Sequence, residues 1–180
     1  MKKIILLNAF LLLCLSVSAQ NIFSAIKEND VLAVKYLINK GADVNARDEQ
    51  GSTPLINAVK NGQERIVILL LQKNVDVDMK DKEGNTALMA ACQYGRINEM
   101  HLVATHFPDV NVRNKNGVSA LIAAVTTNNA EAVKYLVKHE ANAKAKDKQN
   151  RSALDYAKES TNTEITSLLG LPETPVKESK

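Results

Sequence analysis

The sequence predicts an all-α solenoid of about five helix-turn-helix units joined by hairpin-like loops, preceded by an N-terminal signal peptide. The first observation is a period of 33 residues, which separates Thr53, Thr86, Ser119 and Ser152. Each of these hydroxyl residues is followed two positions later by leucine and five positions later by alanine. The second observation is the i, i+3, i+4 spacing of apolar residues in the second half of three units, which is typical of a helix. The third is a polar stretch, such as GADVNARDEQG from Gly41 to Gly51, that separates one unit from the next.

The first 19 residues have the three parts of a secretory signal peptide. Two lysines precede an apolar run from Ile4 to Leu15, and the small residues VSA end the segment at Ala19. We expect cleavage after Ala19, no membrane span in the processed chain, and export to the periplasm or the medium. A retained anchor is disfavoured because the run is shorter than the roughly 20 apolar residues that a spanning helix needs. Lipidation of Cys14 is disfavoured because Leu13 is too large for the Leu-small-small-Cys pattern of lipoprotein signals.

Each first helix is predicted from a hydroxyl cap and a turn-forming end. In GSTPLINAVKNG, Thr53 can cap the helix, Pro54 suits the first helical position, and Asn61-Gly62 can supply a left-handed exit. A helix of only about two turns is marginal alone in water, so neighbouring units must hold it through a shared core of leucine and small alanine side chains. On this pattern the units span residues 20–49, 50–82, 83–115, 116–148 and 149–170, and the polar residues 171–180 are predicted to be a disordered tail.

The charge balance argues against a nucleic-acid partner. The 180-residue chain carries 23 Lys and Arg and 20 Asp and Glu, and two of the lysines precede residue 20. The processed chain therefore has 21 basic and 20 acidic residues, a net charge of +1, and no tryptophan for base stacking. Of the two cysteines only Cys92 follows the cleavage site, so we expect no intramolecular disulfide.

These features resemble the ankyrin repeat, whose pattern is Gly-x-Thr-Pro-Leu-His-x-Ala-Ala, then a glycine, a Val-Val-x-Leu-Leu helix and Gly-Ala-Asp-Val-Asn. The stretch KGADVNARD from Lys40 to Asp48 is close to the family's loop letter for letter, and the resemblance covers about Gln20 to Leu169. It implies a module that binds another protein through a concave surface made by loop tips and first helices. We expect a non-catalytic monomer with no catalytic residue, cofactor or metal.

The chain departs from the family pattern in three places. Glu99 occupies a slot that the other units fill with apolar residues. Either the helix is rotated so that Ile97 takes the core position, or the carboxylate lies at a partly wet edge. Phe107 and the following proline replace the Gly-Ala that ends the second helix, and Thr161 replaces the glycine of the left-handed turn, which a β-branched residue suits poorly.

No set of residues predicts an active site. His101, His106 and His139 fall on second helices, and the five-residue gap between the first two does not place them on one face. Cys92 takes the slot of valines in other units, which favours a small core residue over a nucleophile. An enzyme or metal-site protein that uses the histidines is therefore the less favoured alternative.

Basic residues recur one period apart at one loop position in each of the first four units, and acidic residues follow most of them. We expect a solvated edge whose charges neutralise each other. The basic residues are Arg47, Lys80, Arg113 and Lys146, and the acidic residues are Asp48, Asp81 and Asp147.

The resemblance also assigns candidates for partner binding, on the groove side of the first helices and at the loop tips. We expect binding of a folded protein outside the cytoplasm, and the alternative is a secreted effector that acts on a protein of a host or neighbouring cell. The groove candidates are Asn57, Lys60, Asn61, Gln93, Tyr94, Thr126 and Thr127, and the loop-tip candidates are Ser52, Lys82, Asn85, Lys115, Val118, Lys148 and Arg151.

Tyr94 is the strongest of these candidates. Its counterparts one period away, Asn61 and Thr127, are polar, so core packing does not evidently require an aromatic residue there. Tyrosine is enriched among residues that dominate interface energy. The alternative is that Tyr94 only covers the neighbouring loop.

Overall fold

The computed structural model describes residues 21–172. The predicted signal peptide, Cys14 and most of the predicted tail lie outside the described residues. The chain forms two compact units, and the boundary in sequence falls between Asp43 and Val44. The single array predicted for residues 20–170 therefore stays a prediction. Within residues 21–172 there are ten α-helices and, apart from two isolated β-bridges, no β-structure, which confirms the all-α class.

The first unit is one helix pair, α2 (Ile22–Lys27) and α3 (Val31–Asn39). Asn21 caps α2 by accepting a hydrogen bond from the Ser24 backbone N–H at 2.9 Å, and Asp30 caps α3 in the same way. Side-chain caps of this kind satisfy backbone donors that a short helix cannot pair internally. The two helices bury Ile22, Ala25, Ile26, Val34 and Ile38.

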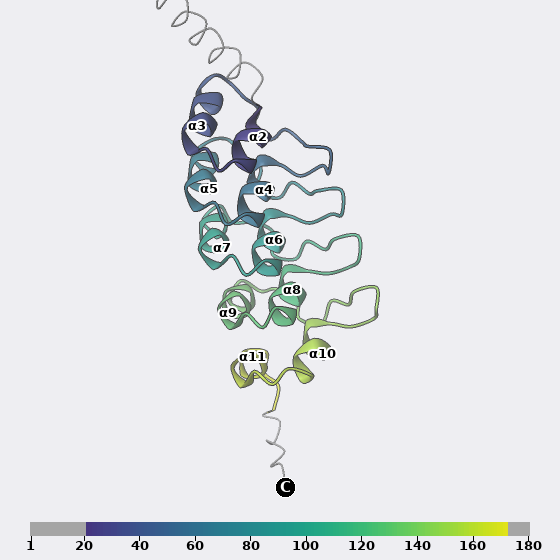
Figure 1. The fold of residues 1–180 in the computed structure, drawn as a ribbon. Coiled ribbons are helices and arrows are strands. Elements are labelled where there is room, and N and C mark those ends of the chain that lie inside the picture. The colour runs from purple at the N-terminus through teal and green to yellow at the C-terminus, as the bar shows by residue number, and fades with distance from the viewer. Residues whose placement is uncertain (1–20, 173–180) are drawn as a thin grey trace, which may run out of the picture. The chain divides into compact units, whose positions relative to one another are not determined.

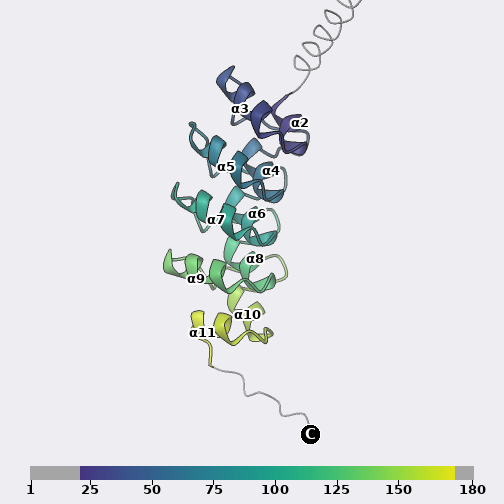
Figure 2. The same cartoon turned by 60° about the vertical axis from the view of Figure 1, so that its left-hand side comes forward.

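The second compact unit, which begins at Val44, stacks four helix pairs in register (Figure 1). Its first helices pack on one another in sequence order, and its second helices form a parallel row beside them, which Figure 2 shows from another side. The hairpin loops project from the other side of the first helices (Figure 1). The first helices are α4 (Pro54–Lys60), α6 (Ala87–Gln93), α8 (Ala120–Thr126) and α10 (Ala153–Lys158), and the second helices are α5 (Glu64–Leu71), α7 (Ile97–Ala104), α9 (Ala130–Lys138) and α11 (Thr163–Leu168).

The predicted caps of the first helices are confirmed. The hydroxyl of Thr53 accepts the Ile56 backbone N–H at 3.2 Å, Pro54 opens α4, and Gly62 leaves the helix with a φ of +68°. The hydroxyls of Thr86, Ser119 and Ser152 cap the other three first helices through the same contact.

The core follows the leucine and alanine columns of the sequence. Leu88 and Leu121 are completely buried, as are Ala91 and Ala124, so the small side chains let the first helices approach while the leucines fill the layer between them. Leu154 is only half-buried, because it belongs to the last helix pair of the stack. Among the described helices, none is long and apolar enough to cross a membrane.

Glu99 keeps the register of its apolar counterparts. Its side chain is 6% exposed and Ile97 is only partly buried, so the proposed rotation of α7 is wrong. Instead, Glu99 lines an open surface cavity of about 320 Å³ together with Gly62, Gly95 and Arg96, which fits the second interpretation, a partly wet edge. Its place in the first turn of α7 also sets the negative charge at the positive end of the helix dipole.

The other two departures change the chain path differently. Phe107 adopts a φ of +51° and is 88% exposed, so an aromatic side chain occupies a left-handed position. Thr161 does not have a positive φ, in contrast to Gly62, Gly95 and Asn128 in the same slot. Accordingly α10 ends at Lys158, one residue earlier in the repeat than α4, α6 and α8.

Candidate partner-binding surface

The predicted binding residues lie on two neighbouring parts of the second unit, the first helices and the hairpin loops. We call this the loop–helix surface and define it by α4, α6, α8 and α10 with the hairpins 46–52, 79–85, 112–118 and 145–151. Its geometry depends on how each hairpin is closed and how it is attached to its neighbours.

Each hairpin is closed around one Asp or Asn side chain. In the second hairpin, Asp81 Oδ1 accepts the backbone N–H groups of Glu83 at 3.0 Å and Asn85 at 2.8 Å. Asp48, Asn114 and Asp147 make the same pair of bonds in the other hairpins. Such side-chain turns fix the loop without any tertiary contact. The acidic column therefore closes the hairpins and is not a set of free counter-charges.

Neighbouring hairpins are joined by one backbone hydrogen bond each. The donors are the N–H groups of Lys82, Lys115 and Lys148, and their distances to the preceding hairpin's carbonyls are 3.0, 2.9 and 2.9 Å. Arg47 and Arg113 add a second link, because each guanidinium donates to a carbonyl of its own hairpin and to a carbonyl of the next one. The hairpins thus form a continuous ladder along the unit.

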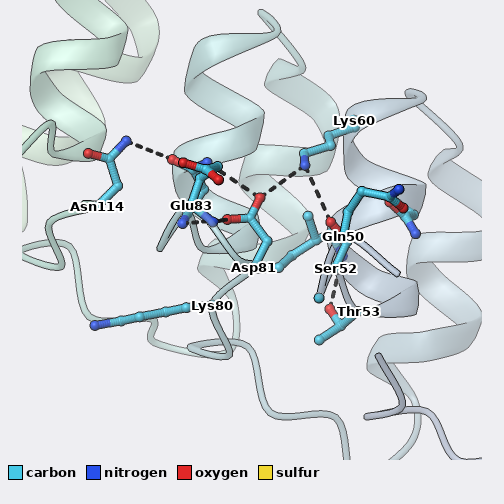
Figure 3. A network of polar contacts seen from close by, with 12 residues as sticks. Gln50, Ser52, Thr53, Lys60, Lys80, Asp81, Glu83 and Asn114 are labelled. Atoms are coloured by element: carbon cyan, nitrogen blue, oxygen red, sulfur yellow. Dashed lines mark hydrogen bonds and ion pairs between the residues drawn. The ribbon is translucent and has the colours of Figure 1, made fainter. Parts of the chain in front are cut away.

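A polar network ties the second hairpin to the first helix of the preceding repeat (Figure 3). The Lys60 ammonium lies 3.1 Å from Asp81 Oδ2 and 3.5 Å from the Ser52 hydroxyl. Burial alone would raise the pKa of Asp81, but the N–H of Asn85 and the Lys60 ammonium outweigh it, so the pKa lies below its usual value of 3.8. Asp81 is therefore ionised at neutral pH and holds Lys60 in place.

The first and last hairpins are attached to their own helices. Asn57 donates to Asp48 Oδ2 at 2.7 Å, and the Tyr156 hydroxyl donates to Asp147 Oδ2 at 2.6 Å. Burial opposes ionisation of Asp147, yet the bonds from Tyr156 and from the Arg151 and Gln149 N–H groups lower its pKa. The loops and first helices consequently form one connected scaffold.

The structure divides the predicted binding residues into two groups. The first group supports the scaffold: Asn57 and Lys60 hold hairpins, Asn85 accepts a bond from Asn114 at 2.8 Å, and Arg151 pairs with Glu159 at 2.6 Å. Val118 is half-buried, and Ser52 is only 2% exposed, so its assignment to a loop tip is wrong. Ser52 is buried because it follows the turn glycine and leads directly into α4.

The second group is exposed. Tyr94 is the C-cap of α6 and is 50% exposed. In the next repeat the Thr127 hydroxyl lies 2.8 Å from the Ala123 carbonyl of its own helix and 3.1 Å from the Cys92 carbonyl. The exposed candidates are Asn61, Gln93, Tyr94, Thr126 and Thr127 on the helices, and Lys82, Lys115 and Lys148 on the hairpins.

A second ladder of side chains was not anticipated. Asn45, Asp78 and Asn111 each accept, through a side-chain oxygen, the backbone N–H of the residue 31 positions later. The distances are 2.9, 3.0 and 2.8 Å. The signal was present in the sequence, since these residues share one repeat slot with a short polar side chain, whereas Lys144 in the same slot has none.

The histidines and the cysteine do not assemble a reactive site. His101 lies 2.8 Å from Glu131, His106 contacts the Leu71 carbonyl, and His139 stacks on a tyrosine. Among residues 21–172, no three His, Cys, Asp or Glu side chains converge as metal ligands would. Cys92 is completely buried, and this burial raises the pKa of its thiol to about 12.

Comparison with known families agrees with this architecture. The family model described as ankyrin repeats in three copies matches residues 22–106 and 98–175, which is more than half of the chain. A comparison with curated proteins gave no match. The match to the family model shows that the chain belongs to the ankyrin-repeat family.

Proposed function

We propose that this chain binds a folded protein partner outside the cytoplasm through the loop–helix surface. Ankyrin repeats are protein–protein interaction modules, so the coarse function follows from the family. The placement outside the cytoplasm is supported by the basic, apolar and small-residue parts of residues 1–19.

The exposure of Tyr94 is the observation that carries the surface assignment. It is half exposed at the C-terminal end of α6, in the middle of the second compact unit. The hairpin ladders hold the surrounding backbone in place, so binding would order few groups that are free beforehand. An exposed aromatic residue on such a pre-organised scaffold is suited to anchor a protein partner.

Affinity capture with the tagged chain from the exported fraction tests this proposal. Tyr94→Ala should weaken binding of the captured protein by at least about 2 kcal/mol, with little change in the melting curve. Tyr36→Ala is a matched control, since Tyr36 is 49% exposed but lies on α3, a second helix. Equal binding by both variants would refute the surface assignment. A lowered melting temperature of Tyr94→Ala with unchanged binding would show that Tyr94 stabilises the fold and does not anchor the partner.

The compartment in which the mature chain accumulates distinguishes a partner in the same cell from a target in another cell. Cell fractionation into cytoplasm, periplasm, membrane and medium would place the mature chain. Accumulation in the periplasm supports a resident binding module, whereas accumulation in the medium supports a secreted effector. Retention in the cytoplasm would contradict both.

A further inference from the structure

The charges of the four hairpins are not evenly distributed along the ladder. Hairpins 46–52 and 79–85 together carry three basic and four acidic residues. Hairpins 112–118 and 145–151 together carry five basic residues and a single acid, Asp147. One cause is that Asn114 replaces the Asp that closes each of the other hairpins. Because Asn114 forms the same turn bonds, the positive charge is gained without loss of the loop geometry.

The basic residues of the last two hairpins are available to a partner. Asp147 is 6% exposed, and both of its oxygens are already used by bonds within the hairpin and from Tyr156. Arg151 pairs with Glu159, but Lys115, Lys146 and Lys148 are exposed and have no ion pair with any described residue. When Asp147 and Glu159 are counted against the five basic residues of the two hairpins, three positive charges remain, so the local field is positive.

The second hairpin is different although it carries two lysines. Lys80 and Lys82 share it with Asp81 and Glu83, so its formal net charge is zero, whereas hairpin 145–151 has three basic residues and one acidic residue. Figure 3 shows Lys80 extending away from the Lys60–Asp81 network, so its side chain is not required for that network. The predicted self-neutralising edge thus describes the first two hairpins, and the last two depart from it.

We infer that the protein partner presents an acidic surface to hairpins 112–118 and 145–151, an inference that rests on the proposed function. Unpaired lysines on fixed loops attract an acidic surface over about one Debye length, roughly 8 Å at physiological salt. The acidic residues of the first two hairpins would repel the same surface. This difference sets the direction in which the partner lies along the ladder.

A protein fits this surface better than other polyanions. The basic patch is confined to two hairpins, and the processed chain has a net charge of only +1. Tyr94 and the polar ends of α6 and α8 lie on the same loop–helix surface, where they offer side-chain contacts that a uniformly charged polymer does not need.

Because the hairpins repeat, a charge change in the last hairpin can be matched by the same change in the second hairpin as a control. Lys80 and Lys82 occupy the slots of Lys146 and Lys148, and all four side chains are exposed. Lys82 and Lys148 use only their backbone N–H to join the neighbouring hairpin, so a new side chain leaves that bond intact. The double substitutions K146E/K148E and K80E/K82E therefore change the total charge equally and differ only in position.

Binding of the purified chain to poly-L-glutamate at low salt, followed by calorimetry, is the direct test. We expect K146E/K148E to weaken binding at least about tenfold and K80E/K82E to change it less than about twofold. Melting curves of both variants should match that of the unmodified chain. Equal losses in the two variants, or no binding of poly-L-glutamate, would overturn the inference. Preferential binding of heparin or of phosphatidylglycerol vesicles would also overturn it, in favour of a non-protein polyanion.

The captured partner separates failure of this inference from failure of the proposed function. If K146E/K148E and K80E/K82E bind the captured protein equally while Tyr94→Ala does not, the binding surface stands and the acidic partner is refuted. If Tyr94→Ala binds like the unmodified chain and K146E/K148E does not, the charge inference stands and the Tyr94 anchor is refuted.

Discussion

Gly117 faces the backbone of the next hairpin, and its replacement should show whether the hairpin ladder stabilises the protein. Its φ of +76° costs an alanine about 1–2 kcal/mol. An added Cβ would also lie 2.9 Å from the Cα of Asp147, too close for an ordinary contact. Moving hairpin 145–151 away would break the 2.9 Å bond from the Lys148 N–H to the Asn116 carbonyl, a loss of about 0.5–1.5 kcal/mol. We expect Gly117→Ala to lower the free energy of unfolding by about 1.5–3.5 kcal/mol.

Gly95→Ala is the matched control for this substitution. Gly95 has a similar φ of +64°, but nothing lies within 4 Å of an added Cβ. Its replacement should therefore cost only the conformational part, about 1–2 kcal/mol. Urea denaturation followed by far-UV circular dichroism measures both losses. If Gly117→Ala were no more destabilising than Gly95→Ala, the contact between hairpins would not contribute to stability.

Three further predictions concern the core and the carboxylates. Leu121→Ala should cost about 2–5 kcal/mol in urea denaturation, and Leu154→Ala less, because Leu121 is fully buried and Leu154 is not; equal losses would contradict the repeat register. Glu99→Ile should leave the free energy of unfolding unchanged or raise it by up to about 2 kcal/mol, and a large loss would reveal a specific partner of the carboxylate. The pKa of Asp81 is lowered in the folded chain, so its contribution to the free energy of unfolding should be present above pH 3.8 and lost as the pH falls through the folded pKa. Between those pH values, Asp81→Asn should lose less free energy of unfolding on acidification than the unmodified chain.

The helices and their caps could be predicted because their signals are local and repeated. Thr53 and Pro54 specify the start of α4 within a few residues, and the 33-residue period then transfers that assignment to the other repeats. Glu99 could be placed in its slot by the same period, but the choice between rotation and a wet edge required the positions of Gly62 and Gly95 beside it.

The contacts of the loop–helix surface could be predicted less completely, because many of them join residues of different repeats. Lys60 reaches an aspartate 21 residues later, and Arg47 reaches a carbonyl 33 residues later. A helical or loop pattern within one repeat contains neither contact, so Lys60 looked free and Ser52 looked exposed. The turn-closing roles of Asp48 and Asn114 are easier to predict from the sequence, since a short polar residue before a turn glycine is a known signal for a side-chain turn.

Hydrogen–deuterium exchange of the chain, with and without its captured partner, tests most directly whether the loop–helix surface binds protein. We predict slower exchange on binding at the end of α6 and in hairpins 112–118 and 145–151, with no change in α5, α7 and α9. Slower exchange confined to those second helices would contradict the assignment of the binding surface.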